Sequence, residues 1–103
     1  MNLKLRGKKV LVTGASQGIG LAIAQAFHAQ GCYVISNARD KKKLESSIIG
    51  KERWHFVAGD VTDPSQANNV VEKALHYLDQ IDILICNVGS GRSAPPGKER
   101  LDD

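Results

Sequence analysis

Short apolar runs alternate with longer amphipathic stretches along this chain of 103 residues. The apolar runs have the length and the β-branched content of buried strands, and they occupy residues 10–12, 32–36, 54–58 and 81–86. Between them, apolar residues recur every three or four positions, as on one helix face, over residues 19–30, 40–48 and 63–79. The pattern therefore predicts the order β-α-β-α-β-α-β.

This order is typical of a parallel sheet with helices on both faces. Right-handed crossovers place the first two helices on one face. If the fourth strand lies beside the first, the strand order is 3-2-1-4 and the third helix falls on the opposite face. A ligand is then expected above the carboxyl ends of strands 1 and 4, where the winding reverses. The length suits one domain, and residues 87–103 are expected to form a loop or a disordered tail.

The helix ends carry their own signals. Gly31 is expected to end the first helix, while Asp40 and Asp63 can cap the second and third. Gln66 can reach back to Asp63 as in a capping box. The first helix is expected to bury an apolar face made of Ile19, Ala22, Ile23, Ala26 and Phe27.

A glycine-rich turn joins the first strand to the first helix and reads Thr13-Gly14-x-x-x-Gly18-x-Gly20. A side chain at Gly14 or Gly18 would block the turn or the approach of a pyrophosphate, and one at Gly20 would push the helix off the sheet. Strand, turn and helix together present free N–H groups to a phosphate at the positive end of the helix dipole. The spacing fits neither G-x-G-x-x-G nor a P-loop. Its position nevertheless predicts dinucleotide binding, with a structural loop as the alternative.

Composition and charge narrow the class of protein. No apolar run approaches the roughly 20 residues of a membrane span, and residues 1–9 lack the apolar core of a signal peptide. Cys32 and Cys86 fall in predicted strands as buried, reduced thiols, which suits a cytoplasmic protein, and no cluster has zinc-site spacing, so no metal is expected. The net charge of +3 admits nucleic-acid binding, but the aromatic residues are not interleaved with the lysines as a stacking surface requires. We therefore expect neither nucleic acid nor a membrane as a partner.

Four motifs, in the order of the predicted fold, resemble the short-chain dehydrogenase/reductase family. They are the glycine turn at 13–20, the second strand at 31–34 followed by Arg39, Asp-Val-Thr-Asp at 60–63, and Cys-Asn-Val-Gly at 86–89. The resemblance covers nearly the whole chain and implies a Rossmann-type, doubly wound α/β sheet, here incomplete. It also implies that residues 1–103 are the N-terminal, NAD(P)-binding part of a short-chain oxidoreductase.

The resemblance also implies a role for each motif. The implied phosphate contacts are Ser16, Gln17, Gly18 and Ile19, and Gly14 and Gly20 belong to the same implied cofactor-binding turn. The implied adenine contacts are Asp60, Val61 and Val88, and the implied ribose contacts are Asn87 and Gly89. Alternatively, Asp60 only forms a turn, and Asn87 only caps the end of a strand.

The choice of cofactor depends on the end of the second strand. A carboxylate there would bind the ribose 2′-OH and repel a 2′-phosphate, but this chain has Ala38 followed by Arg39. A guanidinium can clamp a phosphate, and the lysines at 41–43 add positive charge, so NADP(H) is favoured over NAD(H). Gln17 argues the other way, because many NADP-preferring members carry a basic residue there. The alternative for Arg39 is a solvated loop charge.

The family's catalytic Tyr-x-x-x-Lys is missing: Tyr33 is followed at the fourth place by Asn37, and Tyr77 by Ile81. No catalytic residue is therefore assigned. The chain is interpreted as the N-terminal fragment of a carbonyl reductase or alcohol dehydrogenase, with a 3-oxoacyl thioester reductase as one option. The fragment itself is expected to be inactive. The alternatives are a non-catalytic dinucleotide-binding or regulatory module and, more remotely, a nucleic-acid-binding α/β domain.

A fragment of this fold would leave its fourth strand without a neighbour. Part of the first strand is expected to be under-covered together with Ile81, Ile83, Leu84 and Ile85. Exposed edges of this kind invite pairing with another chain. We therefore expect a homo-oligomer, formed through the fourth-strand edge or the uncovered face.

Overall fold

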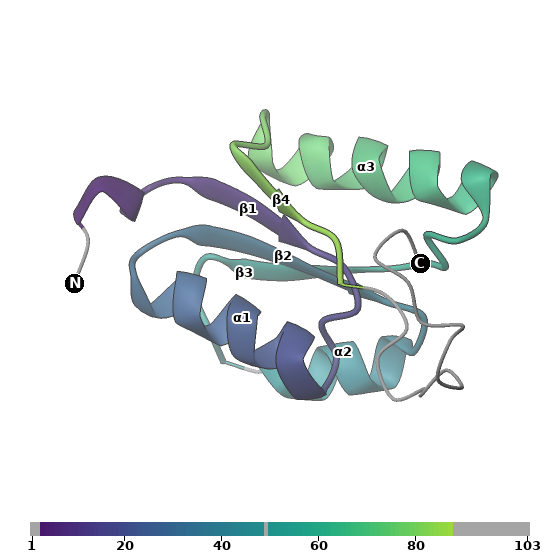
Figure 1. Cartoon of the computed structure of the whole chain (residues 1–103), viewed down its shortest axis with the longest axis horizontal. Helices are drawn as coiled ribbons and strands as arrows, with labels where there is room; N and C mark the ends of the chain where they lie inside the picture. The colour runs from purple at the N-terminus through teal and green to yellow at the C-terminus, as the bar shows by residue number, and fades with distance from the viewer. Residues whose placement is uncertain (1–2, 49, 88–103) are drawn as a thin grey trace, which may run out of the picture.

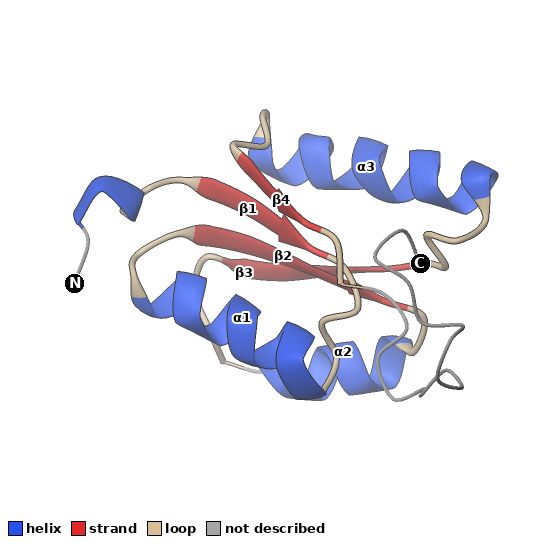
Figure 2. Ribbon diagram, in the orientation of Figure 1, coloured by secondary structure: helices blue, strands red, loops and turns tan. Residues whose placement is uncertain are grey.

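The computed structural model describes residues 3–48 and 50–87, which form one four-stranded parallel sheet with helices on both faces (Figures 1 and 2). The strands are β1 (Lys9–Val12), β2 (Tyr33–Ala38), β3 (Trp54–Ala58) and β4 (Ile83–Ile85). A short 3-10 turn, η1 (Leu3–Leu5), precedes them, and the helices are α1 (Gly18–Ala29), α2 (Lys41–Ile48) and α3 (Pro64–Leu78). The sheet order is β3-β2-β1-β4, which confirms the predicted order 3-2-1-4.

Successive strand residues point to opposite faces of the sheet and so pack into two separate hydrophobic cores. On one face, Val10 and Val34 pack towards α1 and α2. On the other, Leu11 and Ile35 pack with Val70 of α3. Figure 1 shows the same division, with α1 and α2 together on one side of the sheet and α3 on the other. The predicted placement of the helices, and with it the position where the winding reverses, is confirmed.

The second strand is longer than predicted. Asn37 and Ala38 lie beyond the predicted end of this strand at residue 36, but both belong to β2, and Asn37 is 1% exposed. Its side-chain amide donates to Val57 O over 2.9 Å and to Gly59 O over 3.2 Å. Since buried polar groups must be hydrogen-bonded, these two acceptors on and just after β3 allow a polar residue to remain inside the sheet.

The fourth strand is shorter than predicted, because Ile81 and Cys86 lie outside it. Cys86 is exposed, so its predicted burial is wrong, whereas Cys32 is fully buried as predicted. The Cys32 thiol donates to Leu5 O over 3.2 Å, and burial raises its pKa. Cys32 itself lies just before β2, not in it.

The sheet beside β4 is better covered than expected. Val10, Leu11 and Val12 are at most 1% exposed, so the prediction of an under-covered first strand is wrong. Leu84 of β4 is 53% exposed, which agrees with the prediction for the fourth strand. The three β1 residues are buried because β1 lies between β2 and β4 with a core on each face.

The helix α1 is rotated relative to the predicted face. Ile19 is 72% exposed, and the buried positions are Gly20 and Ala24, with Ile23 and Phe27 partly buried beside them. Ala22 and Ala26 of the predicted apolar face are both exposed. The close approach of Gly20 to the turn sets this rotation, and periodicity alone does not reveal it.

The predicted caps are confirmed in most details. The Asp40 carboxylate accepts from the N–H groups of Lys42 and Lys43, and Asp63 accepts from the Ser65 N–H over 3.0 Å. Gln66 does reach back, but its Oε1 accepts from the Asp60 N–H over 2.8 Å. The reciprocal bond of a capping box, to the N–H of Asp63 itself, is therefore absent in this structure.

Candidate functional site

The carboxyl ends of β1, β2 and β4 meet at one edge of the sheet, where polar groups join them. The Thr13 N–H donates to Ile85 O, and the Asn87 N–H donates to Thr13 Oγ1, each over 2.9 Å. On the other side of β1, the Ala15 N–H donates to Asn37 O over 2.8 Å. These bonds fix the chain that leaves β1 against both neighbouring strands.

The glycine turn itself is built from two left-handed residues and one close contact. Gly14 and Gly18 both have φ of +61°, a conformation that costs an L-residue roughly 1–2 kcal/mol. A Cβ at Gly14 would overlap Asn87 O, whereas one at Gly18 would meet nothing within 4 Å. The turn is therefore closed on the side of Gly14 and open beside Gly18.

Gly20 is required for a different reason from the one predicted. A Cβ there would overlap Gly14 O and would lie 2.5 Å from Asn87 Nδ2. That amide donates to Gly14 O over 3.1 Å. A side chain at position 20 would thus strike the turn and its clamp before it displaced the helix from the sheet.

The first turn of α1 presents unsatisfied backbone donors. The first bond into the helix runs from the Leu21 N–H to Gln17 O over 3.3 Å, and the Gln17 side chain makes no capping bond. Among the described residues, nothing accepts from the N–H groups of Gly18, Ile19 and Gly20. Free N–H groups at the positive end of a helix dipole form an anion-binding site.

Asp60 lies at the end of β3 and keeps one carboxylate oxygen available. Its Oδ1 accepts from the backbone N–H of Thr62 over 2.9 Å and also from the Thr62 hydroxyl. The side-chain bond from Thr62, then the backbone bond and the charge of Arg39, hold the pKa of Asp60 below its usual value. The residue is therefore an ionised acceptor that also forms a turn, and Val61 beside it packs against the core under α3.

Basic residues border the same edge between β2 and α2. Arg39 is exposed directly after β2. Lys43 projects from the first turn of α2, and its Nζ donates to Gln17 Oε1 over 3.1 Å. This contact joins the start of α1 to α2 and places an ammonium beside the glycine turn.

The structure thus gathers most of the predicted residues at one edge of the sheet. Those within the described chain are Gly14, Ser16, Gln17, Gly18, Ile19, Gly20, Arg39, Asp60, Val61 and Asn87. Val88 and Gly89 lie outside the described residues, as does the tail that follows them. Asn87, for its part, uses its side-chain amide to hold Gly14 O.

Sequence reasoning missed two residues that organise this edge, Thr13 and Asn37. Thr13 is 4% exposed and links β1 to β4 through its backbone and its hydroxyl. Asn37 supplies the carbonyl that holds Ala15. The sequence does carry a signal for both residues, because each is a polar residue that directly follows an apolar strand. Such a residue either begins a turn or is buried and hydrogen-bonded to a neighbouring strand.

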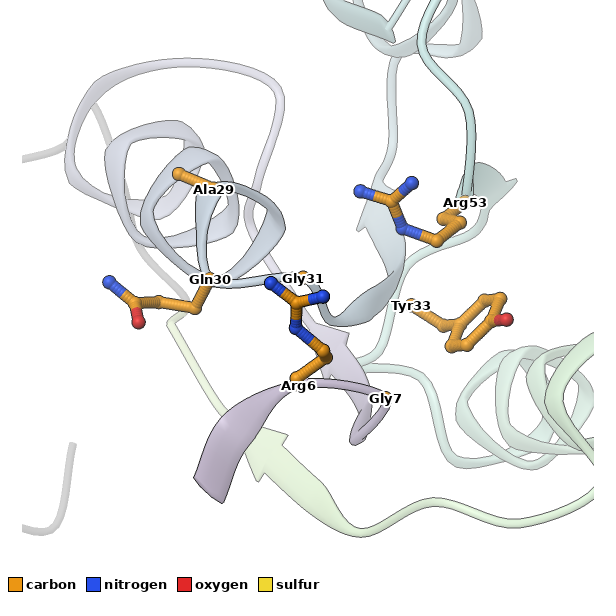
Figure 3. A pocket seen from close by; sticks show the side chains of 7 residues that line it. All are labelled: Arg6, Gly7, Ala29, Gln30, Gly31, Tyr33 and Arg53. Carbon is orange, nitrogen blue, oxygen red and sulfur yellow. The ribbon is translucent and has the colours of Figure 1, made fainter. Parts of the chain in front are cut away.

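A hollow of about 370 Å³ lies at the opposite edge, beside the amino ends of β1 and β2. Figure 3 shows its lining, in which Arg6 and Arg53 come from separate segments and Ala29 and Gln30 end α1. The negative end of the α1 dipole faces this hollow, which favours the two guanidinium groups and opposes an anion. It is therefore a weaker candidate ligand site than the glycine turn.

Residues 3–48 and 50–87 contain no group of three or more His, Cys, Asp or Glu side chains that could hold a metal ion. Within the same residues, no helix has both the length and the apolar character needed to cross a bilayer.

Strand order and glycine turn together define a Rossmann-type α/β fold with its open corner at the point where the winding reverses. The sequence profile described as "short chain dehydrogenase" matches residues 8–102. The chain belongs to this family.

Individual relatives agree with that assignment. The chain is 36% identical to a glucose 1-dehydrogenase of Gluconobacter oxydans, over 97% of this chain and 40% of the relative. It is also 36% identical to a 3-oxoacyl-[acyl-carrier-protein] reductase of Rickettsia conorii, over 84% of this chain and 35% of the relative. A crystal structure of a 3-ketoacyl-(acyl-carrier-protein) reductase from Brucella melitensis, complexed with NADH, superposes with a TM-score of 0.74 at 33% identity, covering 78% of this chain and 33% of that one. The chain thus spans two-fifths or less of the length of these relatives.

Proposed function

We propose that this chain is the cofactor-binding part of a short-chain oxidoreductase that prefers NADP(H) to NAD(H). The observation that carries the proposal is the uncapped start of α1, where the N–H groups of Gly18, Ile19 and Gly20 have no acceptor among the described residues and the space beside Gly18 is open. A pyrophosphate is the ligand that such a corner suits best.

The residues around the corner fit the rest of a dinucleotide. Asp60 keeps one oxygen for a donor such as the adenine amino group, and Val61 offers its backbone beside it. Arg39 stands where an acid would select the ribose 2′-OH, and a guanidinium there favours a 2′-phosphate. Asn87, Val88 and Gly89 complete the proposed contacts at the ribose and the adenine. The bound cofactor supplies or accepts the hydride.

Catalysis by the whole protein requires residues beyond those assigned above. The 103 residues contain no Tyr-x-x-x-Lys sequence, so we expect the chain alone to bind the cofactor without reducing a ketone. The names of the Rickettsia and Brucella relatives favour a 3-oxoacyl thioester as the substrate class of the whole protein. The exposed Leu84 on β4 supports self-association of the chain through this edge.

A pair of matched glycine variants tests the proposal. Gly18 and Gly50 both have positive φ, +61° and +75°, and a Cβ at either meets nothing within 4 Å. Gly18→Leu and Gly50→Leu should therefore carry similar backbone strain, but only the first places a side chain in the proposed pyrophosphate corner. Binding is measured by titration calorimetry with NADPH and NADH, and folding by circular dichroism.

We expect wild type and Gly50→Leu to bind NADPH more tightly than NADH, and Gly18→Leu to lose both. Absence of binding by the folded wild-type chain, or equal binding by the two variants, would contradict the proposed function.

A further inference from the structure

A single contact between helices that are distant in the sequence points to an additional specificity residue. Gln17 is the N-cap of α1, yet its side chain makes no bond to the helix that it caps. Instead, Gln17 Oε1 accepts from Lys43 Nζ over 3.1 Å, across 26 positions of sequence. The amide therefore orients an ammonium group at the mouth of the glycine turn.

The backbone around Lys43 explains how the side chain is delivered there. Asp40 Oδ1 accepts from the N–H groups of Lys42 and Lys43, which fixes the first turn of α2. Leu44, the next residue, is fully buried and anchors the helix on the face that α2 shares with α1. Because Asp40 caps the start of α2 and the adjacent Leu44 is buried, the Lys43 side chain extends along the surface towards the start of α1.

The charge of this ammonium is not neutralised within the described chain. Its hydrogen-bond partner is a neutral amide, and no carboxylate among residues 3–48 and 50–87 forms an ion pair with it. Arg39 likewise forms no ion pair there, although its charge lowers the pKa of Asp60. Two cations thus border the Asp40 turn, and neither forms an ion pair within the described residues, so both ends remain able to pair with a bound dianion.

We infer that Lys43, positioned by Gln17, is a second specificity-determining cation that acts with Arg39 on the 2′-phosphate of NADP(H). The inference rests on the proposed function, since Gln17 borders the pyrophosphate corner and Arg39 the ribose. Lys43 contacts Gln17 and lies in the first turn of α2, which begins at Lys41, two positions after Arg39. In the proposed complex it would stand between the pyrophosphate and the 2′ position of the ribose.

The test compares two lysines that share a helix. Lys43→Met removes the charge and keeps the length of the side chain, and Lys42→Met removes the same charge about 100° further round the helix. Both residues are exposed, so both variants should fold. Titration calorimetry measures the affinities for NADPH and NADH, and adenosine 2′,5′-bisphosphate and AMP serve as smaller probes of the 2′-phosphate alone.

We expect Lys43→Met to weaken NADPH and adenosine 2′,5′-bisphosphate about tenfold, the loss of one charge-assisted hydrogen bond. NADH and AMP should change by less than about twofold, and Lys42→Met, which removes only the longer-range field of its charge, should weaken NADPH by no more than about twofold. The double variant Gln17→Arg with Lys43→Met returns a cation to the same place and should restore the preference for NADPH.

Each alternative result is decisive. If Lys43→Met matches Lys42→Met, or weakens NADH as much as NADPH, Lys43 does not read the 2′-phosphate and the inference fails, while the proposed function stands. If the folded wild-type chain binds neither NADPH nor NADH, the proposed function fails and the inference fails with it.

Discussion

Replacing Gly20 with alanine tests how tightly the glycine turn is built. The new Cβ would lie 2.5 Å from Asn87 Nδ2 and would overlap Gly14 O. This is roughly 1 Å inside the usual van der Waals separation of about 3.5 Å. Gly14 O is a backbone atom and cannot swing away, whereas the Asn87 side-chain amide can move only by giving up its hydrogen bond to Gly14 O.

The cost of the substitution has three parts. Overpacking of this degree costs about 1–3 kcal/mol, and separating the Asn87 amide from Gly14 O removes a bond worth about 1 kcal/mol. The better helix propensity of alanine offsets up to about 1 kcal/mol. The free energy of unfolding should therefore fall by about 2 kcal/mol, which for a chain of this size lowers Tm by roughly 10 °C.

Urea unfolding followed by the fluorescence of Trp54 measures this change, because Trp54 is the one tryptophan of the chain and is buried in the core under α1 and α2. Gly18→Ala is the matched control, since its Cβ meets nothing within 4 Å and only the left-handed backbone is strained. A Gly20→Ala protein as stable as wild type, or more stable than Gly18→Ala, would refute the steric account of this position.

Two further predictions concern acid stability and association. Asp63 accepts hydrogen bonds from the hydroxyl and N–H of Ser65 and from Gln66, which hold the pKa of its carboxyl below the usual value. Because the folded pKa is the lower one, Asp63 contributes stability above about pH 4, where the unfolded carboxyl is ionised, and this contribution is lost as the pH falls through the folded pKa. Urea unfolding at pH 6 and pH 3 should show a smaller acid-induced loss for Asp63→Asn, which retains a capping oxygen; an equal loss in both proteins would contradict this. The chain should also self-associate through β4, so light scattering over a range of concentrations should show dimers or larger species that Leu84→Lys weakens. A monomer at every concentration would count against that edge as an interface.

The order of strands and helices could be predicted because it depends on local patterns. Apolar runs, helical periodicity and the caps at Asp40 and Asp63 are each encoded within a few residues. The parallel sheet then follows from the alternation of elements and the handedness of their connections. The glycine turn was predictable for the same reason, since a strand, a turn and a helix follow directly in sequence.

The details that were missed depend on partners far along the chain. Asn37 can remain in β2 only because Val57 and Gly59 supply acceptors. The rotation of α1, which exposes Ile19, depends on the contact between Gly20 and the turn. The Gln17–Lys43 bond spans two helices. None of these contacts can be inferred from the spacing of residues within one helix or strand.

The clamp by Asn87 has a consequence for how the molecule assembles. This residue holds Gly14 from 73 positions away, and Thr13 from 74. Closing a loop of that length carries a large entropic cost before any contact repays it. The glycine turn at the start of α1 is therefore completed only after β4 has docked. During translation this turn is made early, but it reaches its final conformation only after Asn87 has left the ribosome.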